Sequence, residues 1–120
     1  MKKQILICRI VLPVAALLIS NSLFAGDAAK IEKGKASYTT NCVLCHGEKG
    51  DGNGPAGAAM NPKPRNLVSD PFKAGDSAKQ INDTITNGLK NTSMAGFGHL
   101  GKEEIEALTE YVLSIHTAKG

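Results

Sequence analysis

The stretch Cys42-Val43-Leu44-Cys45-His46 decides how the rest of this sequence should be interpreted. Two cysteines three positions apart place their thiols on one side of a helical turn, and the histidine follows directly. Four chemistries use such spacing: a structural disulfide, a redox-active dithiol, half of a zinc site, and the attachment of a c-type haem. A zinc site needs a second Cys/His pair, which the sequence lacks. A redox dithiol is typical of a strand–helix unit, which the sequence does not predict.

Haem attachment is the interpretation that uses all three reactive side chains of this motif. The thiols of Cys42 and Cys45 can add to the two vinyl groups of one haem and form thioethers. His46 follows immediately and can reach the iron as an axial ligand, so one short segment provides both covalent anchoring and ligation. The motif therefore predicts one covalently bound haem c.

Residues 1–25 have the order of features found in a secretory signal peptide. Three basic residues within the first nine positions precede an apolar run over residues 10–19, and a short polar break leads to Ala25. We expect cleavage after Ala25 and an exported, periplasmic domain over residues 26–120. An uncleaved membrane anchor is the alternative, although the apolar run is short for a span of about 20 residues.

The charge of the chain changes when this segment is removed. The whole sequence has 14 Lys and Arg against 11 Asp and Glu, a net charge of +3. Lys2, Lys3 and Arg9 account for the excess, which leaves 11 basic residues against 11 acidic ones in the predicted mature chain. The basic character is therefore no argument for nucleic-acid or membrane binding. We expect no nucleic-acid partner and no stable membrane insertion after cleavage.

Hydrophobic periodicity predicts an all-α domain with three main helices joined by long loops. The first helix is expected over residues 28–41, the second from an N-cap at Asp76 to Gly88, and the last from about Lys102. The apolar stripes of the last two helices consist of Ala78, Ile81, Ile85 and Leu89 and of Ile105, Leu108, Val112 and Ile115. The small domain has few aromatic residues and no tryptophan, so we expect its loops to wrap around the haem.

An electron carrier usually fills the sixth iron position as well, and a thioether raises the reduction potential relative to a second imidazole. Met94 lies in a glycine-containing loop between the last two helices and can fold over the opposite haem face. Met60, only 14 residues beyond His46, is expected to fill the core. His99 is an alternative ligand, and His116 is expected to face solvent.

The sequence resembles the class I c-type cytochromes over nearly all of residues 30–116, and their bacterial periplasmic subgroup in particular. That subgroup includes haem-c domains associated with terminal oxidases and other respiratory enzymes. The ordered motifs that carry the resemblance are Gly34 and Tyr38, Cys42-x-x-Cys45-His46-Gly47, Gly50-Asp51-Gly52-Asn53-Gly54-Pro55, Pro62-x-Pro64-Arg65-Asn66-Leu67, Gly88, Met94-x-Gly96-Phe97, and Leu108-x-x-Tyr111-Val112.

The resemblance implies a cytochrome c fold in which the first helix crosses the last. Gly34 would permit the close approach near Leu108 and Tyr111. The resemblance also implies that His46 and Met94 are the two axial ligands of the iron.

The resemblance implies roles for two loop residues as well. The backbone carbonyl of Pro55 would accept the second ring N–H of His46, although a plain turn residue is the alternative. Arg65 would pair with a haem propionate, or else be an exposed loop arginine. Two departures stand out. Ala95 occupies a position where many relatives have proline, which predicts a less rigid methionine loop and a weaker iron–sulfur bond. Gly101 replaces the usual polar cap of the last helix, where glycine is tolerated.

These features predict an electron-transfer protein rather than an enzyme. The iron would change oxidation state without taking a substrate into its coordination sphere, and the thioether edge of the haem would contact redox partner proteins that bind weakly and briefly. One alternative is an open-site haem enzyme or gas sensor, in which Met94 does not bind iron. The other is a fixed haem-c subunit of a larger oxidoreductase complex.

Overall fold

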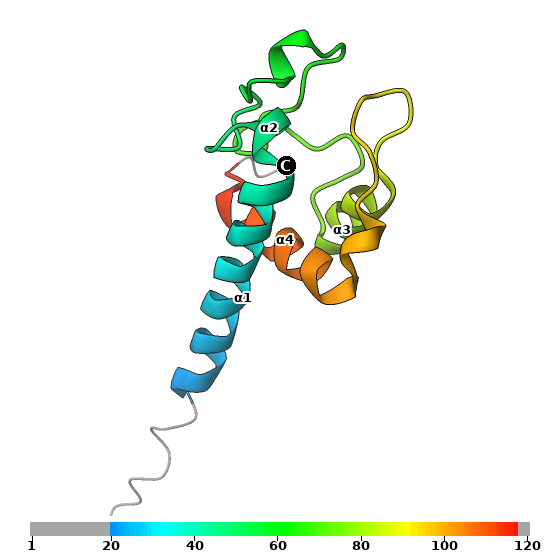
Figure 1. Cartoon of the computed structure of the whole chain (residues 1–120). Coiled ribbons are helices and arrows are strands. Elements are labelled where there is room, and N and C mark those ends of the chain that lie inside the picture. The colour runs from blue at the N-terminus through cyan, green and yellow to red at the C-terminus, as the bar shows by residue number, and fades with distance from the viewer. Residues whose placement is uncertain (1–19, 118–120) are drawn as a thin grey trace, which may run out of the picture.

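The computed structural model describes residues 20–117, and within that range it contains helices and loops but no strand. The elements follow one another as α1 (Ser20–Asn41), α2 (Val43–His46), η2 (Gly57–Ala59), α3 (Ala78–Asn87), η3 (Gly98–Leu100) and α4 (Lys102–Ile115), where η denotes a 3₁₀ turn. The all-α class and the three main helices are confirmed. Figure 1 shows the long loops arching over the ends of α1, α3 and α4.

The predicted signal peptide lies at the edge of the described part of the chain. Residues 1–19 are outside the described residues, and α1 begins at Ser20, so the expected cut after Ala25 falls within its first turns. This end of α1 projects away from the rest of the domain (Figure 1). Between residues 20 and 117, no helix combines the length and apolar composition needed to span a membrane.

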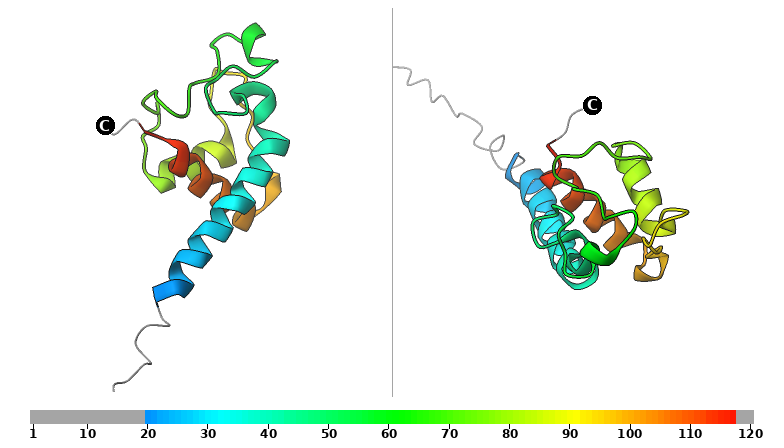
Figure 2. Two further views of the ribbon diagram at one scale, coloured as in Figure 1. Left: turned by 90° about the vertical axis from the view of Figure 1, so that its left-hand side faces the viewer. Right: turned by 90° about the horizontal axis from the view of Figure 1, so that it is seen from above.

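α1 and α4 cross at close range and form the base of the fold (Figure 2). A Cβ atom on Gly34 would overlap the carbonyl oxygen of Ala107 and would lie 2.9 Å from the Cβ atom of Tyr111. The rings of Tyr38 and Tyr111 pack together with their centroids 5.1 Å apart. The expected close approach at Gly34 is confirmed, with Ala107 as the nearest neighbour.

The apolar core forms where α1, α3 and α4 meet. Its buried side chains are Tyr38, Ile81, Ile85, Ile105, Leu108, Tyr111 and Val112. Ile115 and Leu89 are only partly buried, at the ends of their predicted stripes. Ala78 was expected in the stripe of α3 but is exposed, because it is the first residue of that helix.

The cap of α3 differs from the prediction, because Ser77 takes the place expected for Asp76. The backbone N–H of Gln80 donates to Oγ of Ser77, and Oε1 of Gln80 accepts from the backbone N–H of Ser77, both over 3.3 Å. This capping box satisfies two donors that the start of a helix leaves free. Gly88 ends the helix as predicted, with a φ of 73° that favours glycine.

His116 was expected to face solvent, and the structure corrects this. The helix ends at Ile115, and the extended backbone of His116 turns its side chain toward the loop that contains Leu67 and Phe72. Nδ1 of His116 lies 2.7 Å from the carbonyl oxygen of Leu67, and the imidazole stacks on the ring of Phe72 with the centroids 4.2 Å apart. His116, at the end of α4, therefore holds the loop that contains Leu67 and Phe72 in place through a hydrogen bond and a ring stack.

Candidate functional site

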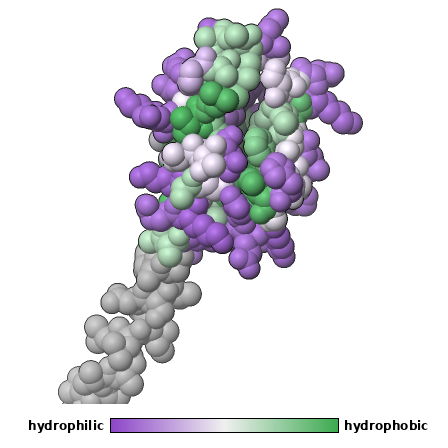
Figure 3. Space-filling model, in the orientation of Figure 1, coloured by the Kyte–Doolittle hydropathy of each residue, from purple (hydrophilic) through white to green (hydrophobic). Residues whose placement is uncertain are grey.

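A cavity of about 470 Å³ opens between the α2 side of the domain and the α3 side. Figure 3 shows apolar side chains on both sides of this hollow. The cavity lies within the range of about 300–1,000 Å³ that is usual for cofactor sites. Its apolar lining includes Leu67, Phe72, Ile81, Ile85, Leu89, Phe97, Leu108 and Val112.

The Cys-x-x-Cys-His motif forms one wall of this cavity. The backbone N–H of His46 donates to the carbonyl oxygen of Cys42 over 2.9 Å, which closes the helical turn of α2. Cys42, Cys45 and His46 all line the cavity, and both thiols are free and partly buried. One short turn thus brings two cysteines and a histidine to the same cavity.

Burial sets the protonation of these groups. It raises the pKa of the Cys42 thiol to about 11, with a smaller contribution from the charge of Cys45, so this thiol is protonated at neutral pH. Burial also lowers the pKa of His46, an effect that the carbonyl of Arg65 partly opposes. A neutral imidazole is the form that binds a metal.

The tautomer of His46 is fixed by a backbone carbonyl. Nδ1 lies 3.3 Å from the carbonyl oxygen of Arg65, which can only accept, so Nδ1 carries the proton and Nε2 keeps its lone pair. Pro55 was expected in this role, but its turn packs against the carbonyl end of α2, where the N–H of Ala56 donates to the carbonyl of Leu44 over 2.9 Å. The acceptor in this structure is therefore Arg65, and Pro55 is an exposed turn residue.

The side chain of Arg65 lies at the rim of the same cavity. Its Nη1 donates to the carbonyl of Pro71, which holds the guanidinium at the edge of the loop. Lys63 and Lys73 line the cavity nearby, together with one acid, Asp70. The rim therefore offers mainly cationic groups, and Arg65 retains further donors for a carboxylate.

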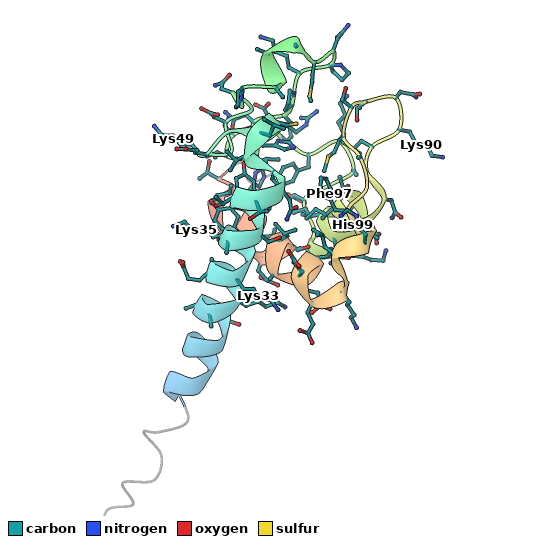
Figure 4. The ribbon with its side chains drawn as sticks, in the orientation of Figure 1. Lys33, Lys35, Lys49, Lys90, Phe97 and His99 are labelled. Carbon is teal, nitrogen blue, oxygen red and sulfur yellow. The ribbon has the colours of Figure 1, made fainter. Side chains whose placement is uncertain are left out.

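The methionine side of the cavity is built from the loop after α3. Met94 lines the cavity, and so does Met60, which the sequence placed in the core. His99 is exposed and does not belong to the cavity lining. Figure 4 shows it beside Phe97, where η3 leads into α4. The ring centroids of Phe97 and His99 are 6.0 Å apart. The structure thus brings Met94 and His46 to one cavity and leaves His99 outside it.

These residues fit a haem. Two thiols and a neutral imidazole belong to one wall, a thioether lines the same cavity, and the lining is largely apolar. The cationic rim suits the carboxylates of the propionates. Cys42 and Cys45 would attach the group, and His46 and a methionine would ligate the iron.

Known proteins resemble this chain in both sequence and structure. The family profile described as Cytochrome c matches residues 31–116. The chain is 33% identical over 106 residues to the Cbb3-type cytochrome c oxidase subunit CcoP of Azospirillum brasilense, covering 88% of this chain and 35% of the relative. It is 36% identical over 95 residues to the Cbb3-type cytochrome c oxidase subunit FixP of Azorhizobium caulinodans, covering 79% and 29%. The chain thus spans about a third of the length of these curated relatives.

A solved structure shares the fold as well. A chain of the reducing HAO-like protein complex of Kuenenia stuttgartiensis superposes with a TM-score of 0.63 at 30% identity, covering 71% of this chain and 42% of that chain. The family profile spans most of the described residues, and it includes the motif, the crossing of α1 and α4, and both walls of the cavity. The chain therefore belongs to the cytochrome c family, whose domains carry covalently attached haem c and transfer electrons.

Proposed function

We propose that residues 26–120 form an exported, periplasmic carrier of single electrons with one haem c and with His46 and Met94 as axial ligands. The observation that supports this most is the shared cavity, in which the Cys-x-x-Cys-His motif and Met94 belong to walls built from different segments. Both sides of an iron would then have a protein ligand. A filled coordination sphere suits outer-sphere electron transfer and leaves no position for a substrate.

The residues of the chain have distinct tasks in this proposal. The haem supplies a one-electron couple when bound. His46 is held neutral by burial and oriented by the carbonyl of Arg65. The thioether of Met94 and the apolar walls favour the reduced state and raise the potential. Arg65 would neutralise a propionate at the rim.

The ligation of Met94 can be tested in the haem-loaded protein. The oxidised wild type should show the weak long-wavelength band of a sulfur–ferric bond, and the reduced protein should bind carbon monoxide poorly. Met94→Ala should open the position to carbon monoxide, and Met94→His should keep six ligands but lower the potential. Met60→Leu is the matched control, because Met60 lines the same cavity and this swap conserves volume. Rapid carbon monoxide binding by the wild type, unchanged by Met94→Ala, would instead favour the open-site enzyme or sensor.

A second candidate is a fixed haem-c subunit of a larger complex. Two relatives of this chain are subunits of cbb3-type oxidases, and the chain spans about a third of their length. Leu44, between the two cysteines, is a large apolar side chain that is 62% exposed, and it provides a contact for a redox partner beside the thiols. Copurification distinguishes the candidates. Tagged mature protein that purifies alone supports the carrier, and stoichiometric recovery with membrane subunits supports the fixed subunit.

Export has its own test. The charge pattern and apolar run of residues 1–25 lead us to expect a mature protein that begins at Gly26. Intact mass of the native protein with its haem measures this directly. A mature chain that still contains Lys2 and Lys3 would contradict cleavage and favour the membrane anchor.

A further inference from the structure

The loop that contains Met94 is fastened at both of its ends. Near its start, the N–H of Leu89 donates to the carbonyl oxygen of Met94 over 3.1 Å. At its end, the N–H of Phe97 donates to the carbonyl oxygen of Ile85 over 2.8 Å. Residues 88–97 therefore leave α3 and return to the same helix, as the loop at the side of Figure 1 shows.

Two glycines bring the arms of this loop into backbone contact. A Cβ atom on Gly88 would lie 2.5 Å from the carbonyl oxygen of Met94 and 2.8 Å from the carbonyl carbon of Ala95. A Cβ atom on Gly96 would lie 2.6 Å from the carbonyl oxygen of Thr86. Neither position leaves room for a side chain, so the backbone of Met94 lies directly against the end of α3.

Thr92 bridges the tip of the loop through its hydroxyl group. Its Oγ1 donates to the carbonyl oxygen of Leu89 over 2.8 Å and accepts the backbone N–H of Met94 over 3.1 Å. One hydroxyl can fill both roles, and threonine commonly makes such local bonds to the backbone. Thr92 and Ser93 both line the cavity, but Thr92 is partly buried whereas Ser93 is exposed. The hydroxyl thus restrains the backbone of the residue that provides the thioether.

We propose that Thr92 is a positioning residue that holds the Met94 thioether toward the iron. A proline at position 95 would restrain this loop, but Ala95 does not. The proposal rests on ligation by Met94. The sequence predicted a less rigid methionine loop because Ala95 stands where many relatives have proline. In the structure, the two hydrogen bonds of the Thr92 hydroxyl restrain the loop instead. Without the hydroxyl, the N–H of Met94 loses its acceptor and the carbonyl of Leu89 loses a donor, so the loop opens more often.

Haem-loaded Thr92→Val tests this, because valine keeps the shape and removes the hydroxyl, while Thr92→Ser keeps the hydroxyl. Thr86→Val is the matched control: Thr86 is also partly buried, but its hydroxyl donates within α3, to the carbonyl of Asn82 over 2.8 Å. Thr92→Val should raise the rate of carbon monoxide binding roughly tenfold, since two hydrogen bonds are lost. It should also weaken the sulfur–ferric band. Thr92→Ser and Thr86→Val should stay near the wild type.

The outcomes separate this proposal from the ligation on which it rests. If the wild type shows the sulfur–ferric band and Thr92→Val leaves both the band and the carbon monoxide rate unchanged, Met94 is a ligand but Thr92 does not position it. Equal rate increases in Thr92→Val and Thr86→Val also overturn the proposal, because they indicate a general loss of stability. A wild type without the band overturns ligation by Met94 itself. Amide exchange of the wild type adds a test that needs no variant: the Met94 N–H should exchange more slowly than that of Ser93, and equal rates would contradict the restraint by Thr92.

Discussion

The two walls of the cavity are stabilised in different ways. The thiol wall (residues 38–67) is tied to distant parts of the chain. The ring of Tyr38 packs on the ring of Tyr111 in α4 with the centroids 5.1 Å apart, and the carbonyl of Leu67 lies 2.7 Å from Nδ1 of His116. The methionine wall (residues 88–97) is tied within itself and to the adjoining end of α3.

This difference predicts which wall can move alone. Contacts that cross the fold are lost together with the fold, whereas a segment held by local bonds can open by itself. We therefore expect changes that disturb the thiol wall or its support on α4 to lower the free energy of unfolding. Changes in the methionine wall should alter the iron–sulfur bond while the domain stays folded.

The largest effect should follow from removal of both anchoring thiols. Cys42→Ala with Cys45→Ala should give a largely disordered chain without covalent haem, because the apolar walls of the cavity would face water. Circular dichroism and haem staining on a denaturing gel measure the two effects. Met94→Ala is the control and should keep both the covalent haem and the helices. Cooperative unfolding of the double cysteine variant would show that the core is sufficient without the haem.

The crossing that supports the thiol wall should be the next most sensitive point. Gly34→Ala would place a methyl group on the carbonyl of Ala107, so α1 and α4 must separate. We expect a loss of about 2–3 kcal/mol in the free energy of unfolding, even though alanine favours the helix by about 1 kcal/mol. Denaturant titration of the haem-loaded protein measures it. Ala36→Gly, at an exposed position of α1, calibrates the helix propensity and should cost about 1 kcal/mol.

The methionine wall can be probed with a pair of glycines that share a backbone conformation. Gly88 has φ 73° and ψ −170°, and Gly101 has φ 85° and ψ 160°, a region essentially restricted to glycine, so alanine strains both by about 1–3 kcal/mol. At Gly88 the added Cβ atom also meets the carbonyl of Met94, whereas at Gly101 nothing lies within 4 Å. Gly88→Ala should therefore weaken the sulfur–ferric band, and Gly101→Ala should leave it intact. Equal spectra for the two variants would show that the position of Met94 does not depend on this contact.

The sequence predicted best what depends on residues close together in the chain. The Cys42–His46 turn follows from its own spacing, Gly88 ends α3, and α4 starts at Lys102 as expected. The cap at Ser77 could also have been found, because Ser77 and Gln80 have the spacing of a capping box. Asp76 was preferred only because aspartate is a good cap in isolation.

Other features depend on how the long loop folds back, which local patterns do not encode. The acceptor for His46 is whichever carbonyl of that loop faces inward, and the structure places Arg65 there rather than Pro55. His116 continues the helical pattern in sequence, but its backbone leaves the helix and its ring meets Phe72. The hydrogen bonds of Thr92 to Leu89 and Met94 likewise depend on how residues 88–97 fold back on α3, which the sequence pattern does not show.

The smallest effect concerns a single hydrogen bond in the thiol wall. The hydroxyl of Tyr38 donates over 2.8 Å to the carbonyl of Gly47, the residue after His46, and Tyr38 is only 1% exposed. That carbonyl also accepts the N–H of Gly50 over 3.1 Å, so Tyr38→Phe leaves it with one partner. We therefore expect a loss of about 1 kcal/mol at neutral pH, with an unchanged sulfur–ferric band.

The pH dependence makes this prediction specific to the Tyr38 hydroxyl. Burial, above all, raises the pKa of Tyr38 far above its usual value near 10, so the folded protein keeps the phenol neutral where the unfolded chain ionises. The contribution of the hydroxyl is thus complete below pH 10 and falls by about 1.4 kcal/mol for each pH unit above it. The difference between wild type and Tyr38→Phe in denaturant titrations should disappear about one pH unit above 10. Tyr111→Phe controls for the loss of a tyrosine hydroxyl from the same ring pair. A difference that stays constant from pH 7 to that point would mean that the Tyr38 phenol ionises as readily in the folded protein as in the unfolded chain.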